Sequence, residues 1–171
     1  QMQEVMEAAV TAGINHLETA PAYGPAEAFL GQALRELSDR GIAPTGGWVI
    51  TSKVLPGVTL QEGQAQLQNC LQRLGVPRLD NWAIHGLNLN DHLHWALKGD
   101  GLALMRWARE EGLVGQVGFS SHGTTEVIAD AIASGRFKFC SLHLHLLDPV
   151  HLPLAASALQ ADMGVMAISP A

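Results

Sequence analysis

A repeating pattern constrains the fold of this chain most strongly: a helix-like segment, then a glycine, then a short apolar segment. Glycine is expected just after a helix because the terminating residue usually adopts the left-handed backbone conformation. Successive glycines of the pattern are separated by roughly 23 to 37 residues, the length of one βα unit. The pattern occurs at Gly13, Gly41, Gly75, Gly112, Gly135 and Gly164.

The segments before these glycines have helical periodicity, and those after them are apolar on both faces. Apolar residues recur at three- and four-residue spacing in residues 2–10, 26–37, 60–74, 101–111 and 125–133. The short apolar runs are typical of fully buried parallel strands. Six such strands alternating with helices predict a parallel α/β architecture. Residues 44–47 and 88–101 are predicted loops, the second long enough to hold a short helix.

Two parallel α/β folds fit this alternation, a doubly wound open sheet and a (β/α)8 barrel. The first strand runs into ETAPAYG and lacks the Gly-x-Gly-x-x-Gly sequence that binds dinucleotides in the open-sheet fold. Almost every strand ends in a polar or reactive side chain, and barrel enzymes gather their sites at that rim. We therefore predict that residues 1–171 form a single partial domain, an incomplete (β/α)8 TIM barrel with about six of the eight βα units.

The composition is that of a globular protein and argues against several classes of partner. Hydrophobic residues make up 47% and charged residues 15%, too apolar for disorder and too interrupted for a membrane span. The formal charge of −6, without a basic run, argues against binding nucleic acid or a membrane surface. Cys70 and Cys140 form neither a disulfide framework nor a metal motif, so we expect core cysteines and a reducing, cytoplasmic location. No feature indicates an oligomeric state.

Four polar residues at the ends of the first three predicted strands form a candidate catalytic set: Glu18, Tyr23, Lys53 and His85. A lysine is rarely buried in a strand without a partner, and Glu18 lies on the neighbouring predicted strand. Together these groups can protonate a carbonyl oxygen, because the lysine charge stabilises tyrosinate and the histidine can orient the oxygen. Taken singly, Tyr23 fits a packed loop residue, Lys53 a structural ion pair with Glu18, and His85 a hydrogen-bonded residue at a strand end.

These residues lie in segments that resemble the aldo-keto reductase family. GINHLETAPAYGPAEAFLGQAL is similar to the family's Gly-x-Asn-x-x-Asp-Thr-Ala-x-x-Tyr-Gly signature and the helix that follows it. ITSKV resembles the family's lysine strand, LDNWAIHG its histidine strand and VGQVGFSSHG its nicotinamide-binding strand. HGLN, GFSSHG and AISPA resemble a bacterial branch whose full-length members often carry a C-terminal iron–sulfur segment.

The resemblance implies hydride transfer between a nicotinamide cofactor, NADPH or else NADH, and a small-molecule aldehyde or ketone. By this resemblance, Tyr23 is the general acid, Lys53 and Glu18 tune it, and His85 orients the carbonyl. The cofactor-binding residues would be Ser120, Ser121 and Ser169, the first two at the nicotinamide carboxamide. An iron–sulfur cluster would require a further segment after residue 171, because the two cysteines lack the necessary spacing.

Three departures from the family pattern bear on this expectation. The family's aspartate is Glu18 here, one methylene longer, which changes its reach toward Lys53. Leu142 and His143 stand where many members have a nicotinamide-contacting glutamine, and Ile168 stands where many have a stacking aromatic residue. The residues that grip the adenosine phosphate in family members would follow AISPA, beyond this chain. The departures at Glu18 and Ile168 keep open a barrel subunit that senses the cofactor without turnover.

A further alternative is a metal-dependent barrel hydrolase. His143 and His145 alternate on one predicted strand and therefore face the same way, and His122 ends another strand. A second cluster, in NDHLH, consists of Asp91, His92 and His94. Metal binding is the less favoured interpretation, because carboxylate ligands from other strands are not evident. We expect the strand histidines to line the barrel and NDHLH to be a solvated loop over the rim.

The length of the chain conflicts with a complete barrel, which typically takes about 250 residues. The resemblance puts one barrel strand before Gln1 and one after Ala171, and these two strands are neighbours in a closed barrel. Without them, the barrel would have one breach with two exposed strand edges. We expect the 171-residue polypeptide to be aggregation-prone or poorly active by itself.

Overall fold

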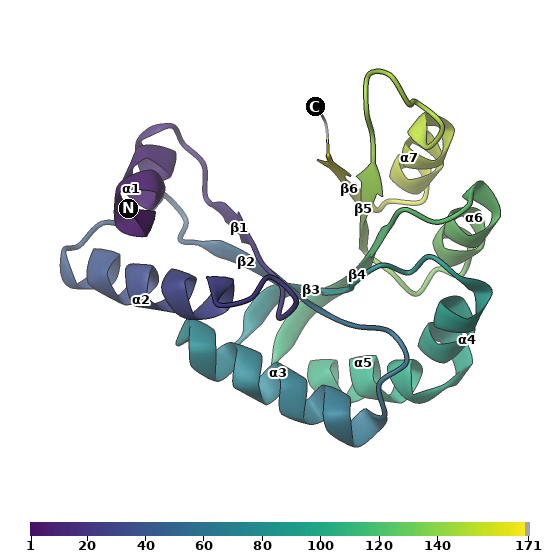
Figure 1. The fold of residues 1–171 in the computed structure, drawn as a ribbon, viewed down its shortest axis with the longest axis horizontal. Helices are drawn as coiled ribbons and strands as arrows, with labels where there is room; N and C mark the ends of the chain where they lie inside the picture. Colours follow the sequence, from purple (N-terminus) through teal and green to yellow (C-terminus); the bar gives the residue numbers. More distant parts are fainter. Residues whose placement is uncertain (170–171) are drawn as a thin grey trace.

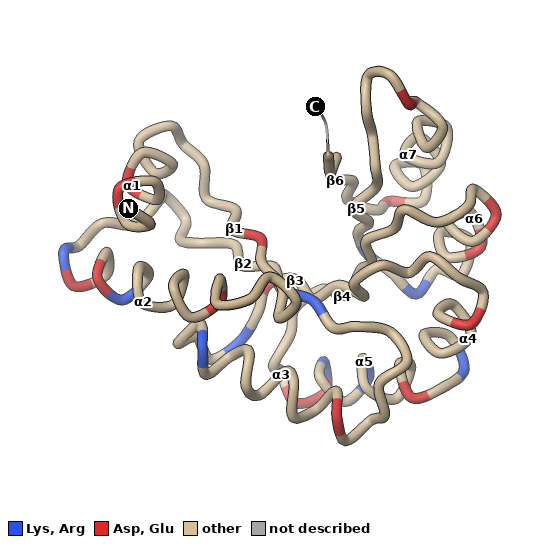
Figure 2. Tube along the Cα trace, viewed as in Figure 1, with Lys and Arg blue, Asp and Glu red and all other residues tan. Residues whose placement is uncertain are grey.

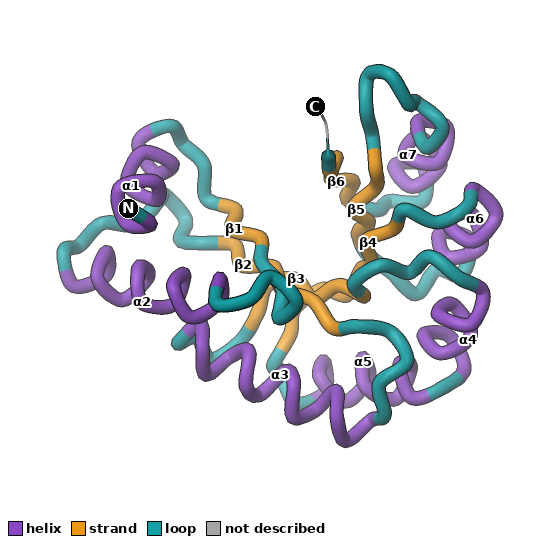
Figure 3. Tube along the Cα trace, viewed as in Figure 1, coloured by secondary structure: helices purple, strands orange, loops and turns teal. Residues whose placement is uncertain are grey.

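The computed structural model describes residues 1–169, which contain one six-stranded parallel sheet with its strands in chain order. The strands are β1 (His16–Glu18), β2 (Val49–Val54), β3 (Leu79–Ile84), β4 (Val114–Ser121), β5 (Phe139–His143) and β6 (Gly164–Ile168). The sheet curls into part of a barrel, and the helices cover its outer side (Figure 1, Figure 3). This arrangement confirms the predicted incomplete (β/α)8 barrel.

The described part of the chain contains seven α-helices. They are α1 (Met2–Thr11), α2 (Ala26–Asp39), α3 (Leu60–Leu74), α4 (Asn90–Lys98), α5 (Asp100–Glu110), α6 (Thr125–Ala133) and α7 (Leu152–Gln160). Residues 88–101 hold the short helix α4 for which the sequence left room. The prediction that NDHLH is a solvated loop is wrong, because these residues form the first turns of that helix. Leu93 and Ala96, three residues apart, are buried in the core and hold α4 against the sheet.

Local sequence signals explain how α2 and α3 are placed behind the sheet. The Thr59 hydroxyl accepts a hydrogen bond from the Glu62 amide, and the Glu62 carboxylate accepts one from the Thr59 amide, so a capping box begins α3. Gly75 ends α3 in the left-handed conformation. Gly31 permits close approach of the two helices, since a Cβ there would lie 2.1 Å from the Arg73 carbonyl oxygen. The packed pair supports β2, which α3 contacts.

The two faces of the sheet differ in chemistry. The hydrophobic core lies between the outer face and the helices and includes the fully buried Trp82 and Phe119. On the inner face, the Thr51 hydroxyl lies 2.7 Å from a ring nitrogen of His16 and accepts a hydrogen bond from the Asn81 amide at 3.2 Å. Polar groups thus face the interior of the partial barrel, where the site described below is built.

Charged residues follow the helices and loops far more than the strands (Figure 2). This distribution fits a sheet whose outer face is covered by an apolar core. Over residues 1–169, none of the helices has the length and apolar character that crossing a bilayer requires.

Candidate active site

The first three strands bring three of the predicted catalytic residues to one rim of the sheet. Glu18 ends β1, Lys53 lies one residue before the end of β2, and His85 directly follows β3. Glu18 is paired with Thr51, and Lys53 with Ala83, so the three side chains lie on the same face of the sheet. The expectation that the strands of Glu18 and Lys53 are neighbours is confirmed.

Lys53 lies at the centre of this group and is only 3% exposed. Its Nζ lies 2.7 Å from Oε1 of Glu18, and it donates to the Thr19 carbonyl oxygen at 3.2 Å and the Tyr23 hydroxyl at 3.1 Å. Three oxygen atoms therefore match the three hydrogens of the ammonium group. The longer side chain of Glu18 makes direct contact with the lysine. An ammonium group held in this way stabilises negative charge on the neighbouring oxygens.

Tyr23 is carried by the loop that follows β1, where its amide donates to the Ala20 carbonyl oxygen at 3.0 Å. The Lys53 Nζ lies 4.7 Å from the centre of the tyrosine ring. The ring of His85 packs edge-on against the same tyrosine, with 5.4 Å between ring centres. Because Tyr23 is 49% exposed, its hydroxyl can reach a bound ligand as well as the lysine.

The electrostatic environment of His85 favours the neutral imidazole. Partial burial, reinforced by the positive charge of Lys53, lowers the pKa of His85, and the nearby Glu18 carboxylate acts in the opposite direction. A neutral imidazole carries one N–H donor and one acceptor nitrogen. His85 can therefore donate a hydrogen bond to a carbonyl oxygen while remaining uncharged.

A cavity of about 730 Å³ lies over these residues, within the size range of small-molecule sites. Ser120 of β4 lines its wall, as do Ile168 and Ser169 at the end of β6. The Ser120 hydroxyl accepts a hydrogen bond from the Gly86 amide at 3.0 Å. Ser121 is fully buried outside the cavity wall, and its hydroxyl donates to the Leu87 carbonyl oxygen at 2.7 Å. The predicted serines thus divide into two that reach the cavity and one that does not.

Asn88 and His92 also line this cavity, although the sequence pattern does not predict it. The Asn88 side-chain oxygen accepts a hydrogen bond from the His122 amide at 2.8 Å and so joins two rim loops. The His92 ring nitrogen Nδ1 lies 3.0 Å from the Gly86 carbonyl oxygen. Only their place in the sequence could have indicated this role, because both residues follow the end of β3. The segments after the strands form the rim where barrel sites lie.

A buried polar cluster lies on the opposite face of β2 from Lys53. Glu27, which is 1% exposed, accepts hydrogen bonds from the Ser52 hydroxyl and from Nε of Arg73, both at 2.7 Å. Burial raises the pKa of the nearby Cys70 thiol to about 12 and that of Cys140 to about 11. Both cysteines are buried, and the predictions that Cys70 is a core residue of a helix and Cys140 a strand residue are confirmed. The Glu27 cluster ties α2 and α3 to the strand that carries Lys53.

The histidines of the metal-site alternative approach one another without forming a ligand set. The ring centres of His122 and His143 are 5.4 Å apart, and those of His143 and His145 are 6.0 Å apart. Within residues 1–169, no group of three or more His, Cys, Asp or Glu side chains is arranged to hold a metal ion. The same holds for the NDHLH cluster, where His92 is turned to the Gly86 carbonyl. This geometry lends the hydrolase alternative no support.

Fold and site together define part of an α/β barrel with a titratable cluster at the C-terminal rim of its strands. The chain belongs to the Aldo/keto reductase family, whose family model matches residues 1–171. The resemblance to this family that the sequence motifs indicate is thereby confirmed.

Solved structures of similar fold carry the same family name. A putative aldo-keto reductase from Pseudomonas aeruginosa is 24% identical, with a TM-score of 0.80 over 96% of this chain and 61% of its own. A Bombyx mori aldo-keto reductase in complex with NADP is 23% identical, with a TM-score of 0.79 over 98% of this chain and 55% of its own. A Brucella melitensis aldo/keto reductase is 22% identical, with a TM-score of 0.77, over 98% and 62%. This chain therefore spans less than two thirds of each.

Proposed function

We propose that the protein is an oxidoreductase that transfers a hydride between a nicotinamide cofactor and an aldehyde or ketone, with Tyr23 as the proton donor. The observation that carries this proposal is the 3.1 Å contact of the Tyr23 hydroxyl with the buried Lys53 ammonium, itself 2.7 Å from Glu18. Family membership and the fold shared with an NADP-bound Bombyx mori enzyme support the same reaction class.

In this proposal, Tyr23 donates its proton to the carbonyl oxygen as negative charge develops there. The product is an alcohol, and the tyrosinate left behind lies beside the Lys53 ammonium. Glu18 and the Thr19 carbonyl oxygen hold that ammonium in place. Because Tyr23 is half exposed, it regains its proton from solvent. Alcohol oxidation follows the same steps in reverse.

His85 acts as the orienting group. Its lowered pKa keeps the imidazole neutral at neutral pH, so that it offers one N–H to the substrate oxygen. With 5.4 Å between its ring centre and that of Tyr23, His85 is near enough for both donors to share one substrate oxygen in this proposal. Two donors fix the direction of the carbonyl group and so set the face that receives the hydride.

A nicotinamide cofactor, when bound, supplies the hydride. The cavity fits this role, because its volume of about 730 Å³ can hold a nicotinamide ring beside a small carbonyl compound. We assign Ser120 and Ser169 to the ring and its carboxamide, and Ile168 to an apolar contact on the ring. Ser121 supports Ser120 from behind through its hydrogen bond to the β3–α4 loop. NADPH is the proposed cofactor, in line with the NADP bound to the Bombyx mori enzyme.

The proposed oxidoreductase function is tested by measuring cofactor binding and cofactor oxidation separately. Quenching of NADPH fluorescence measures binding, and loss of NADPH absorbance with a panel of small aldehydes and ketones measures reduction. The proposal predicts binding and carbonyl-dependent oxidation. Binding without oxidation of NADPH by any carbonyl would contradict it and favour a cofactor-sensing subunit. Both measurements use a complete barrel that contains this chain, because the 171-residue polypeptide by itself is expected to be poorly active. A complete barrel that neither binds nor oxidises NADPH would contradict both functions.

A further inference from the structure

A second cavity, of about 400 Å³, lies on the outer side of the sheet, away from the candidate active site. Five of its lining residues come from α5, and Val117 of β4 and Arg136 before β5 complete it. Val117 faces the helices, whereas Ser120, three residues along the same strand, lines the active-site cavity. The sheet therefore separates the two cavities.

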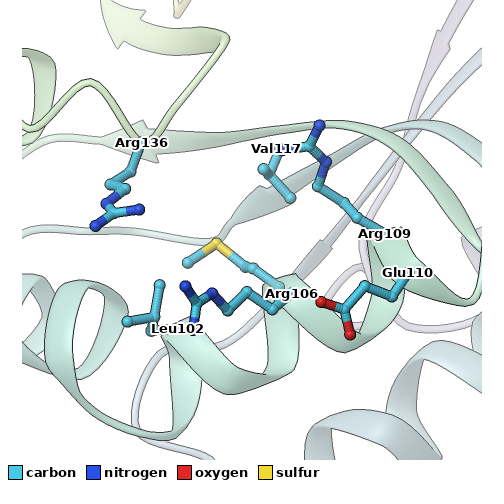
Figure 4. A pocket seen from close by; sticks show the side chains of 7 residues that line it. Leu102, Arg106, Arg109, Glu110, Val117 and Arg136 are labelled. Carbon is cyan, nitrogen blue, oxygen red and sulfur yellow. The ribbon is translucent and has the colours of Figure 1, made fainter.

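Arginine side chains dominate the wall of this outer cavity. Arg106, Arg109 and Arg136 all line it, three of the ten basic side chains in a chain of net charge −6. Within residues 1–169, none of the three forms an ion pair or a side-chain hydrogen bond, whereas Arg40 and Arg73 are both paired with glutamates. Figure 4 shows Arg106 extending along α5 and Arg136 descending from the other side toward the same space.

The charge of the cavity suits a dianion. Three guanidinium groups, which remain protonated at all physiological pH values, face one carboxylate, that of Glu110, so the net charge of the lining is 3 − 1 = +2. Guanidinium groups bind phosphate and carboxylate oxygens through paired N–H donors. A phosphate monoester carries a charge of about −1.5 to −2 at pH 7, which matches this lining.

The remaining lining is apolar. Leu102 and Met105 on α5 and Val117 on β4 line the cavity together with the arginines. Leu102 and Val117 are labelled in Figure 4. Met105 and Val117 belong to the buried core, so this wall is fixed by packing. Met105 and Val117 are only 6% and 4% exposed, so the partly buried Leu102 supplies most of the free apolar surface. An inorganic ion would use the arginines and leave this surface uncovered, whereas a small organic group would cover it.

We propose that this outer cavity is a binding site for an organic phosphate monoester with an apolar body. The phosphate is held by Arg106 and Arg136, with Arg109 adding charge, and the apolar body lies on Leu102, Met105 and Val117. The proposal is independent of the oxidoreductase function, because none of these residues touches the rim of the sheet where Tyr23 and Lys53 lie.

Isothermal titration calorimetry of the full chain with phenyl phosphate tests the proposal. Phenyl phosphate should bind more tightly than inorganic phosphate, which lacks the apolar ring, and more tightly than phenol, which lacks the phosphate. The double variant Arg106→Gln/Arg136→Gln should weaken binding by about 100-fold, at about tenfold for each charge-assisted contact. Arg35→Gln, an exposed arginine on α2 outside the cavity, is the matched control and should bind as the wild type does.

Each other outcome would overturn the proposal. Unchanged binding in the double variant, with the folded state verified by circular dichroism, would mean that the arginines are not the site. Equal loss in Arg35→Gln would mean nonspecific charge attraction. Loss in Lys53→Met, with the arginines intact, would mean that phenyl phosphate occupies the rim cavity instead. Equal affinities for inorganic phosphate and phenyl phosphate would mean that the apolar lining residues do not contact the ligand.

Discussion

At the scale of single residues, the Lys53 ammonium group controls how the other polar groups of the site are arranged. It contacts an oxygen of Glu18, the Thr19 carbonyl and the Tyr23 hydroxyl, and it is buried at the end of a strand. A buried cation without such partners would be strongly destabilising. The additional methylene of Glu18 leaves its contact with the lysine at 2.7 Å, so the longer carboxylate still supplies the counter-charge.

The lowered pKa of His85 predicts how one residue contributes to pH-dependent stability. The folded protein binds the His85 proton less readily than the unfolded chain, so its stability is retained above the unfolded pKa of about 6.5 and lost as pH falls toward the folded value. His85→Gln should therefore reduce the fall in Tm between neutral and mildly acidic pH. NMR titration of the ring resonances should show His85 titrating below the ordinary range of histidine. Titration within or above that range would contradict this account.

At the level of single residues, the sequence predicted the contact of a buried charged side chain that requires a partner. A lysine inside an apolar strand requires an anionic partner, and a strand-end glutamate one βα unit earlier supplies it. Ser121 illustrates the limit, because two adjacent serines at a strand end look alike in sequence. Strand alternation turns one into the cavity and the other toward the Leu87 carbonyl oxygen.

At the scale of elements, the contact between α2 and α3 predicts the cost of a single methyl group. Gly31→Ala would put a Cβ 2.1 Å from the Arg73 carbonyl oxygen, a backbone atom that cannot rotate away. We expect a loss of about 1 to 3 kcal/mol in the free energy of unfolding, measured by urea denaturation. Gly63→Ala, also in a helix, is the matched control, because the three atoms nearest its Cβ all belong to the side chain of Leu104 and none is a backbone atom.

A smaller loss at Gly31 than at Gly63 would contradict this reading of the helix contact. The intrinsic helix preference of alanine favours both substitutions by up to about 1 kcal/mol, so it does not account for a difference between them.

Element-level prediction was strongest where periodicity and glycine signals coincided. The segments of α3 and α6 are predicted with the bounds that the structure has. The prediction of a loop for NDHLH was wrong because polar residues outnumber apolar ones in this short segment, a composition typical of loops. Burial of Leu93 and Ala96 against the core, a tertiary effect, stabilises α4 there.

At the scale of the whole molecule, the order of the strands leaves two edges in the described structure. Over residues 1–169, β1 pairs only with β2, and β6 pairs only with β5. The Gly164 amide donates to the Lys138 carbonyl oxygen on the β5 side. Because the bonding direction alternates along a parallel strand, the Met166 amide also faces β5, whereas the amides of Val165 and Ala167 face the open edge.

These edges predict concentration-dependent self-association of the 171-residue chain, which sedimentation velocity can measure. Ala167→Pro removes only an edge-facing donor, so we expect it to lower self-association while the circular dichroism spectrum is kept. Met166→Pro is the control, because it removes a donor to β5 and should destabilise the sheet. A wild-type chain that stays monomeric at all concentrations would contradict the prediction.

The architecture was predictable from the sequence because the glycine pattern counts βα units and strand ends carry polar residues. The arginine cavity was not predictable, because Arg106, Arg109 and Arg136 come from two segments separated by a strand and a helix. Only the fold brings them to one cavity, because α5 packs against β4 and the loop before β5 carries Arg136.

The rate of carbonyl-dependent NADPH oxidation by Tyr23→Phe, measured in a complete barrel that contains this chain, decides whether Tyr23 donates the proton. The substitution removes only the hydroxyl that lies 3.1 Å from Lys53 and leaves the ring to pack against His85. We predict that carbonyl reduction falls by about 100-fold or more, the usual contribution of a general acid, while NADPH binding is retained. Near-normal carbonyl reduction by Tyr23→Phe would mean that another group donates the proton.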